Sequence, residues 1–135
     1  MSAITSNSPS PPNALFAYGT LMTGESRHQM LERARIKSVR AASISGELLD
    51  MGEHPGLRLS SYSGHRVQGE LIEFEELDTI LPELDAEEGP EFRREIVNVT
   101  VESGNHFAWV YVLAGNNKNL KAIDSGDWRK RHAAR

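Results

Sequence analysis

The sequence predicts an α+β fold, in which a small mixed β-sheet curls toward a barrel and short helices flank it. Six segments have strand patterns and two have helical patterns, and their order does not alternate strand–helix–strand as it would around a parallel sheet. The segment His106–Leu113 is apolar on both faces, which is typical of a central strand covered on each side. The length of 135 residues fits one domain that buries its own core.

The two ends of the chain differ in composition from the part between them. Residues 1–13 are rich in Ser and Pro, and residues 129–135 are mostly basic. We expect a disordered tail at the first end, a solvated basic tail at the other, and a single domain over residues 14–128. Because residues 1–13 hold no apolar stretch, they do not match a secretory signal.

The composition excludes several classes of function. A net charge of −4 argues against nucleic acid as the main partner. The absence of cysteine excludes a thiol nucleophile and fits the reducing cytoplasm. The histidines lack the spacings H-x-H and H-x-x-x-H, so we expect no metal site, and no apolar run is long enough to span a membrane. The motifs of serine hydrolases and of phosphate-binding loops are also missing. We therefore expect a cytoplasmic protein, monomer or homodimer, whose partner is a small molecule.

The strand-like segments are bounded by turn residues. Gly19 ends the first segment, the run Gly52–Gly56 separates two others, and Ser63–His65 and Ser103–Asn105 have the composition of turns. The expected strands are Ala14–Tyr18, Ala41–Met51, Leu57–Ser61, Val67–Phe74, Glu95–Val101 and His106–Leu113.

Two short helices are expected. The first, Ser26–Arg35, has only a rough apolar face. The second begins near Asp78 or Thr79, because Pro82 is tolerated only in the first turn of a helix. Its apolar residues follow the spacing i, i+3, i+4 and i+7, which places them on one stripe. This stripe consists of Leu77, Ile80, Leu81 and Leu84.

The end of the second helix carries a candidate catalytic carboxylate. At about 100° per residue, Glu88 lies about 30° from the centre of the apolar stripe, Glu87 about 70° and Asp85 about 90°. A carboxylate at the edge of an apolar face has a raised pKa, which suits a proton carrier. Alternatively, Glu88 bends back to water or pairs with Arg93 or Arg94.

The loop after the first strand is a candidate binding site. Tyr18, Gly19, Thr20 and Leu21 form a strand end that leads into a glycine turn. Successive backbone N–H groups at such a turn can bind an anion or an oxyanion, and glycine lets a ligand approach closely. The alternative is that Gly19 only ends the strand.

Five short segments are recognisable when they are read in order. Phe16–Leu21 contains Y-G-T-L, and Leu49–Gly52 with Pro55–Leu57 corresponds to a strand and the turn after it. Val67–Leu71 contains V-x-G-E and Leu84–Gly89 contains L-D-x-x-E-G, followed by an arginine at Arg93 or Arg94; Ile123–Trp128 contains S-G-D-W. Together these segments resemble the γ-glutamylcyclotransferase-like family, in its branch of AIG2-like proteins and γ-glutamylamine cyclotransferases. The resemblance covers the chain from about Leu15 to Trp128.

The resemblance implies a small mixed β-barrel with flanking helices, no cofactor, and a cavity between the Y-G-T-L loop and the glutamate. The family's catalytic glutamate corresponds to Glu88, in agreement with the helical geometry, and Tyr18–Leu21 correspond to the substrate-binding loop. One position departs from the family pattern. Phe92 stands where the family usually has tyrosine, so a hydroxyl group is lost from that position.

The expected function is therefore cyclotransfer on a γ-glutamyl amide. The α-amine of the substrate attacks its own γ-carbonyl, forming 5-oxoproline and releasing an amine, while Glu88 moves the protons. Two alternatives stay open: a non-catalytic module that binds a small molecule or partner on the same scaffold, and an enzyme that removes a γ-glutamyl protecting group in a biosynthetic pathway. An unpaired Glu88 would favour the enzymes, and a Glu88 held in a salt bridge would favour the binding module.

Overall fold

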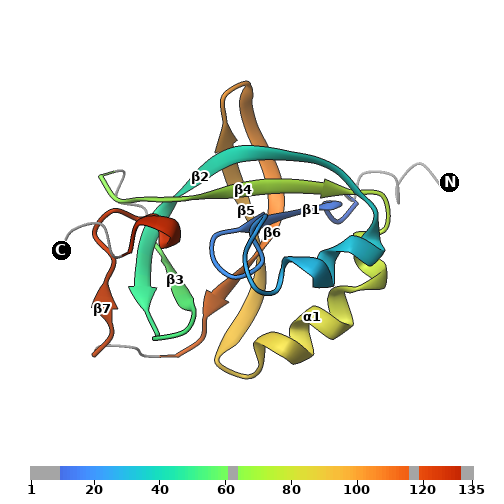
Figure 1. Cartoon of the computed structure of the whole chain (residues 1–135). Coiled ribbons are helices and arrows are strands. Elements are labelled where there is room, and N and C mark those ends of the chain that lie inside the picture. Colours follow the sequence, from blue (N-terminus) through green and yellow to red (C-terminus); the bar gives the residue numbers. More distant parts are fainter. Residues whose placement is uncertain (1–9, 61–63, 116–118, 132–135) are drawn as a thin grey trace, which may run out of the picture.

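The computed structural model describes residues 10–60, 64–115 and 119–131 (Figure 1). The strands are β1 (Ala14–Ala17), β2 (Ile36–Asp50), β3 (Pro55–Leu59), β4 (Arg66–Phe74), β5 (Phe92–Val101), β6 (Gly104–Leu113) and β7 (Lys121–Ala122). The helices are the α-helix α1 (Leu81–Glu88) and the 3₁₀ helices η2 (His28–Ala34), η3 (Leu77–Thr79) and η4 (Trp128–Lys130).

Within the described residues, five strands close into a barrel. The order β2-β4-β1-β6-β5 returns to β2 through the pairing of residues 42–43 with residues 100–101. β1 and β6 run parallel where Leu15 meets Trp109, and the other neighbours in the barrel are antiparallel. The predicted mixed, barrel-like sheet is confirmed.

β2 connects the barrel to the two strands outside it. Its first part, up to Ser45, pairs with β4, whereas residues 46–50 pair with β3, and its last two residues also pair with β7. Figure 1 shows β2 arching over the barrel. β2 begins at Ile36, five residues before the predicted start. Its first residues alternate between half-buried and exposed positions, as in a strand, but few of them are apolar, so the sequence pattern did not mark them. β3 begins at Pro55, inside the predicted loop, since the first residue of an edge strand needs no N–H.

The two predicted helices exist, with shifted bounds. α1 begins at Leu81, so that Pro82 lies in its first turn as required, and residues 77–79 form η3 before it. The helix predicted over Ser26–Arg35 is the 3₁₀ helix η2. The helices lie beside the barrel (Figure 1), and an ion pair between Arg33 and Glu83 joins η2 to α1. None of the helices in the described part of the chain combines the length and apolar character needed to cross a membrane.

The core lies inside the barrel and under the helices. The stripe predicted for the second helix is buried at all four positions, Leu77, Ile80, Leu81 and Leu84. β6 is buried over residues 110–113, but Phe107 is 66% exposed. The prediction of a strand covered on both sides is therefore wrong near its start, because the β5–β6 hairpin extends beyond the barrel (Figure 1). The turn of this hairpin is residues 102–103, one residue earlier than predicted.

Residues on either side of the predicted domain, 14–128, make contacts with it. The backbone oxygen of Asn13 accepts a hydrogen bond from Phe74 N at 2.9 Å. At the other end, η4 runs across the boundary, Arg129 forms ion pairs with the body, and the Arg131 guanidinium lies 3.8 Å from the ring centre of Trp128. Residues 129–131 are exposed, as expected for a solvated tail, although Arg129 and Arg131 also contact the body of the protein. The rest of the predicted tails, 1–9 and 132–135, and the turn residue Ser63 lie outside the described residues.

Candidate active site

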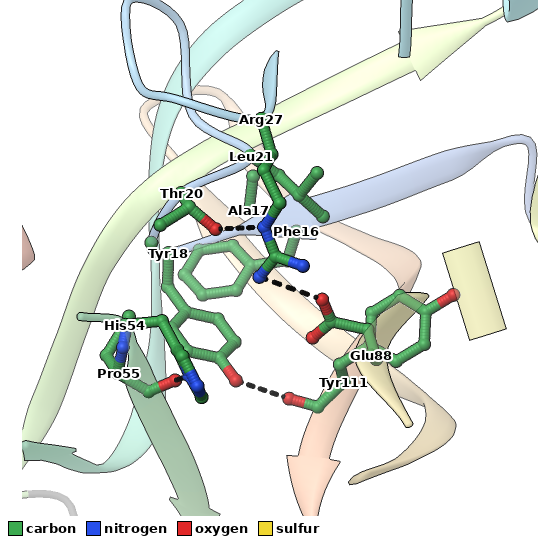
Figure 2. A pocket seen from close by; sticks show the side chains of 11 residues that line it. Phe16, Ala17, Tyr18, Thr20, Leu21, Arg27, His54, Pro55, Glu88 and Tyr111 are labelled. Atoms are coloured by element: carbon green, nitrogen blue, oxygen red, sulfur yellow. Dashed lines mark hydrogen bonds and ion pairs between the residues drawn. The ribbon is translucent and has the colours of Figure 1, made fainter. Parts of the chain in front are cut away.

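Every residue predicted for the site lies around one pocket (Figure 2). Glu88 from α1 faces Tyr18, Gly19, Thr20 and Leu21, which follow β1. The remaining lining residues are Phe16, Ala17, Arg27, His54, Pro55 and Tyr111. This inner pocket has a volume of about 30 Å³. An outer pocket of about 350 Å³ shares Thr20, Arg27, His54 and Glu88 with it and is completed by Ser26, Glu53, Glu87 and Phe92.

We expect from the sequence that the glutamate lines the largest pocket, and this is wrong. A cavity of about 460 Å³ lies elsewhere, between the β2–β4 region and the segment 122–126. The inner and outer pockets at Glu88, of about 30 Å³ and about 350 Å³, are both smaller than this cavity.

Glu88 is the last residue of α1, and its side chain turns inward. Gly89 ends the helix with a φ of 80°, a conformation that side-chain-bearing residues avoid, and its N–H bonds to Asp85 O at 3.1 Å. The side chain of Glu88 is 10% exposed, against 49% for Glu87 and 44% for Asp85. The orientation predicted from the helical geometry is therefore confirmed.

The partner of Glu88 is an arginine that the sequence analysis did not consider. Arg27 Nη2 lies 3.2 Å from Glu88 Oε2, and Arg27 Nη1 lies 3.5 Å from Glu87 Oε2. The predicted alternative partners are engaged elsewhere, Arg93 with Glu95 and Arg94 with Asp85. Arg27 lies in the turn before η2, where no periodic pattern indicates which side chains face the site. Its closeness in sequence to the Y-G-T-L loop was the one signal that could have identified it.

Burial raises the pKa of Glu88 above the ordinary value of 4.5, in spite of its cationic partner. Desolvation of the carboxylate is the largest cause. The positive charge of Arg27 and the electrostatic interaction with His54 lower the pKa of Glu88, and the charge of Glu87 raises it. The carboxyl group is therefore a better proton acceptor than an exposed glutamate.

The loop that faces Glu88 is shaped by a contact between Gly19 and Pro55. A Cβ atom on Gly19 would lie 2.6 Å from Pro55 Cγ and 2.7 Å from Pro55 Cδ. A glycine that ends a strand in a turn predicts a positive φ, but the φ angle of Gly19 is not in the left-handed region, and this prediction is wrong. Glycine is required here because the backbone passes close to the Pro55 ring.

The backbone N–H groups of this loop are the groups predicted to bind an anion. Met22 N donates to Gly19 O at 3.0 Å and Arg27 N donates to Thr20 O at 2.8 Å, which folds the loop. Among the described residues, none of the turn and loop hydrogen bonds uses the N–H group of Gly19, Thr20 or Leu21 as a donor. These three N–H groups are therefore not used in folding the loop, and anion binding by them stays a prediction.

Two tyrosines connect the loop and α1 to the barrel. Tyr18 is buried, and its hydroxyl donates to Tyr111 O at 2.7 Å. Burial, followed by the charge of Glu88, holds the pKa of Tyr18 well above its usual range. The Tyr111 hydroxyl donates to Asp85 Oδ1 at 2.7 Å, and Arg94 binds both oxygens of Asp85. These contacts fix the turn of α1 that carries Glu88.

His54 is a second residue that the sequence analysis left out of the site. It lines both pockets, and its ring lies 6.0 Å from the ring of Phe92, measured between centres. Its position next to Pro55, between the two stretches Leu49–Gly52 and Pro55–Leu57 that resemble the family, was the available signal. No group of three His, Asp or Glu side chains suited to a metal ion is found among residues 10–60, 64–115 and 119–131.

Comparison with known proteins identifies the family of the chain. A family model described as γ-glutamyl cyclotransferase, AIG2-like, matches residues 15–130. The chain belongs to this family. The match includes the loop 18–21, Arg27 and Glu88, and it extends past the boundary predicted at residue 128.

Two relatives are each 35% identical to the chain. One is a protein of Vibrio cholerae serotype O1 that carries the provisional name γ-glutamylcyclotransferase; the alignment covers 87% of this chain and 96% of that protein. The other is the γ-L-glutamyl-butirosin B γ-glutamyl cyclotransferase of Niallia circulans, with 88% of this chain and 76% of that protein covered.

Solved structures share the fold. YkqA from Bacillus subtilis has a TM-score of 0.72 at 24% identity over 90% of this chain, which spans only 41% of YkqA. An AIG2-like protein from Mus musculus has a TM-score of 0.67 at 25% identity, covering 85% of this chain and 88% of that protein.

Proposed function

We propose that the protein converts a γ-glutamyl amide to 5-oxoproline and a free amine, with Glu88 as the general acid and base. The observation that carries this proposal is the buried carboxylate of Glu88, with its raised pKa. It shares one pocket with a loop whose N–H groups at Gly19, Thr20 and Leu21 do not donate in the described turn and loop hydrogen bonds. The relatives named as cyclotransferases support the reaction class.

In the proposed reaction the substrate supplies its own nucleophile. Glu88 removes a proton from the α-ammonium group, and the amine nitrogen attacks the γ-carbonyl carbon to close a five-membered ring. The carbonyl oxygen becomes an oxyanion near the amides of Gly19, Thr20 and Leu21. Glu88 then gives the proton to the leaving nitrogen, and the bond between that nitrogen and the γ-carbon breaks. With this transfer the carboxylate of Glu88 is again unprotonated. A second proton passes from the ring nitrogen to the departing amine, which leaves 5-oxoproline and a protonated amine.

The test is a panel of γ-glutamyl amides incubated with the purified protein and assayed for 5-oxoproline. We expect Glu88→Gln to lower kcat/KM by at least about 10²-fold without loss of the fold, because Gln is nearly the same shape but accepts no proton. Glu83→Gln is the matched control, since Glu83 lies on α1 and pairs with Arg33 outside the pocket. Glu87 is unsuitable as a control because it contacts Arg27. Activity of Glu88→Gln within a few-fold of the parent would remove Glu88 from the mechanism.

A second candidate function is removal of a γ-glutamyl protecting group from a biosynthetic intermediate by the same chemistry. The relative that acts on γ-L-glutamyl-butirosin B favours it. It predicts that γ-glutamyl derivatives of large amines are turned over faster than those of small amines.

The non-catalytic alternative is favoured by a different observation. The ion pair between Arg27 and Glu88 holds the carboxylate that should act as a base. A binding module would bind γ-glutamyl compounds without releasing 5-oxoproline from any member of the panel.

A further inference from the structure

Arg27 holds a position that no step of the proposed reaction uses. Its Nε donates to Thr20 Oγ1 at 2.9 Å, and its backbone N–H donates to Thr20 O at 2.8 Å. The guanidinium is thus anchored at one edge. One of its terminal nitrogens faces the carboxylate of Glu88 (Figure 2), and the other faces the carboxylate of Glu87.

Charge makes Arg27 the natural binding site for an anionic ligand. Among the described residues that line the inner and outer pockets, Arg27 is the only Lys or Arg. The other charged lining groups include Glu53, Glu87 and Glu88, which would repel a carboxylate. A ligand with a carboxylate therefore has one cationic side chain to meet in these pockets.

We propose that Arg27 binds the α-carboxylate of the γ-glutamyl substrate and releases Glu88 in doing so, so that the observed ion pair is the resting state of the site. This inference rests on the proposed function, because it assigns the substrate group that the arginine recognises. The geometry supports an exchange of partners. The contacts of Arg27 to Thr20 keep the guanidinium in place while its outer edge takes a new carboxylate, which guanidinium groups bind with two parallel hydrogen bonds.

The exchange has two consequences for the site. The amides of Gly19, Thr20 and Leu21, predicted to bind an anion or an oxyanion, are left to the oxyanion. Glu88 becomes free to accept a proton when substrate arrives, which reconciles the ion pair with a catalytic role. Neutralising Arg27 also removes a charge that lowers the pKa of Glu88.

The test uses two ligands that cannot react. N-ethylglutaramate has the carboxylate and the γ-amide of a substrate but lacks the attacking amine, and N-ethylglutaramide has a neutral carboxamide in place of the carboxylate. Calorimetric titration of the parent protein should show the carboxylate binding on the order of 10- to 100-fold tighter than the carboxamide. Arg27→Gln should abolish this preference, and Arg27→Lys should keep part of it.

Arg33→Gln is the control, since Arg33 lies on η2 and pairs with Glu83 away from the pocket. Each protein is compared on both ligands, so a general loss of affinity cancels. If Arg27→Gln does not fold, Arg27→Lys provides the comparison, with a preference reduced several-fold from the parent. The proposal is overturned if the parent does not bind the carboxylate more tightly than the carboxamide, or if the preference survives unchanged in the folded Arg27 variants.

The outcome is separate from that of the proposed function. Absence of 5-oxoproline from every γ-glutamyl amide would reject the reaction, yet the binding preference would still identify Arg27 as the carboxylate site. A different result would support the reaction and reject the role of Arg27. In it, Arg27→Gln slows the turnover of γ-glutamyl amides with an α-carboxylate and of analogues with an α-carboxamide by the same factor.

Discussion

At the scale of single residues, two influences act on the carboxyl group of Glu88 in opposite directions. Burial raises its pKa, and the neighbouring Arg27 guanidinium lowers it. Burial is the larger, so the group loses its proton at a higher pH than an exposed glutamate. Burial and the charge of Arg27 together set the pH above which the carboxyl group of Glu88 is unprotonated.

The pH dependence of the reaction follows from these directions. Because the reaction requires the unprotonated carboxylate, we expect the low-pH limb of kcat/KM to lie above the ordinary glutamate pKa of 4.5. Arg27→Gln removes a charge that lowers the pKa, so the limb should move to higher pH. The measurement is kcat/KM between about pH 4 and about pH 9, with Arg33→Gln as the control. A limb below pH 4.5 in the parent, or a shift to lower pH in the variant, contradicts this assignment.

At the scale of elements, the position of α1 depends on a carboxylate that is not itself in the pocket. Asp85 accepts hydrogen bonds from Arg94 and Tyr111, which both lie on the β5–β6 hairpin, and the Arg94 guanidinium lies 4.1 Å from the ring centre of Trp109. Asp85 and Glu88 are one helical turn apart. The hairpin therefore holds the helix in the orientation that turns Glu88 inward.

Hydrogen bonding by Arg94 lowers the pKa of Asp85 below its ordinary value of 3.8. A group with a lowered pKa in the folded protein stabilises it above its unfolded pKa, and this contribution is lost as the pH falls through the folded value. We expect Asp85→Asn to lower the free energy of unfolding by about 0.5–1 kcal/mol at neutral pH, because the pair is partly exposed. The difference from the parent should shrink below pH 3.8.

Urea unfolding at neutral pH and in acid measures this effect. Asp78→Asn, at an exposed position on η3, is the control. A difference between parent and Asp85→Asn that stays constant as the pH falls would show that the charge of Asp85 contributes nothing.

At the scale of the whole molecule, the end of the described chain holds the loop that follows β1. Arg129, next to Trp128 of the S-G-D-W segment, pairs with Glu25 at 3.5 Å and with Glu70 at 3.6 Å, and it donates to Thr23 O. Glu70, from the V-x-G-E segment of β4, also accepts from Thr23 N at 2.8 Å. Glu70 and Arg129 thus both contact the stretch between the loop 18–21 and Arg27.

We expect Arg129→Gln to loosen this stretch. The backbone N–H of Thr23 should exchange with solvent about tenfold faster, and kcat/KM should fall several-fold while the fold is kept. Hydrogen exchange and steady-state kinetics measure the two effects. Lys130→Gln, which changes the adjacent exposed cation, is the control. Unchanged exchange at Thr23 would mean that Glu70 holds the loop without Arg129.

The sequence by itself determined the features that depend on local periodicity or on a short motif. The spacing of Leu77, Ile80, Leu81 and Leu84 fixed the buried face of the second helix, and the same geometry directed Glu88 inward. The order of strands and helices predicted the mixed barrel, and the five motifs predicted the family.

The tertiary structure alone decided which side chains meet at the site. Arg27, Pro55 and His54 reach the pocket from loops, where no period relates a residue to its neighbours across the fold. The need for glycine at position 19 comes from the Pro55 ring, 36 positions further along the chain by residue number. Long-range contacts of this kind depend on how the barrel closes, and for that reason the ion pair between Arg27 and Glu88 could not be derived from the sequence around either residue.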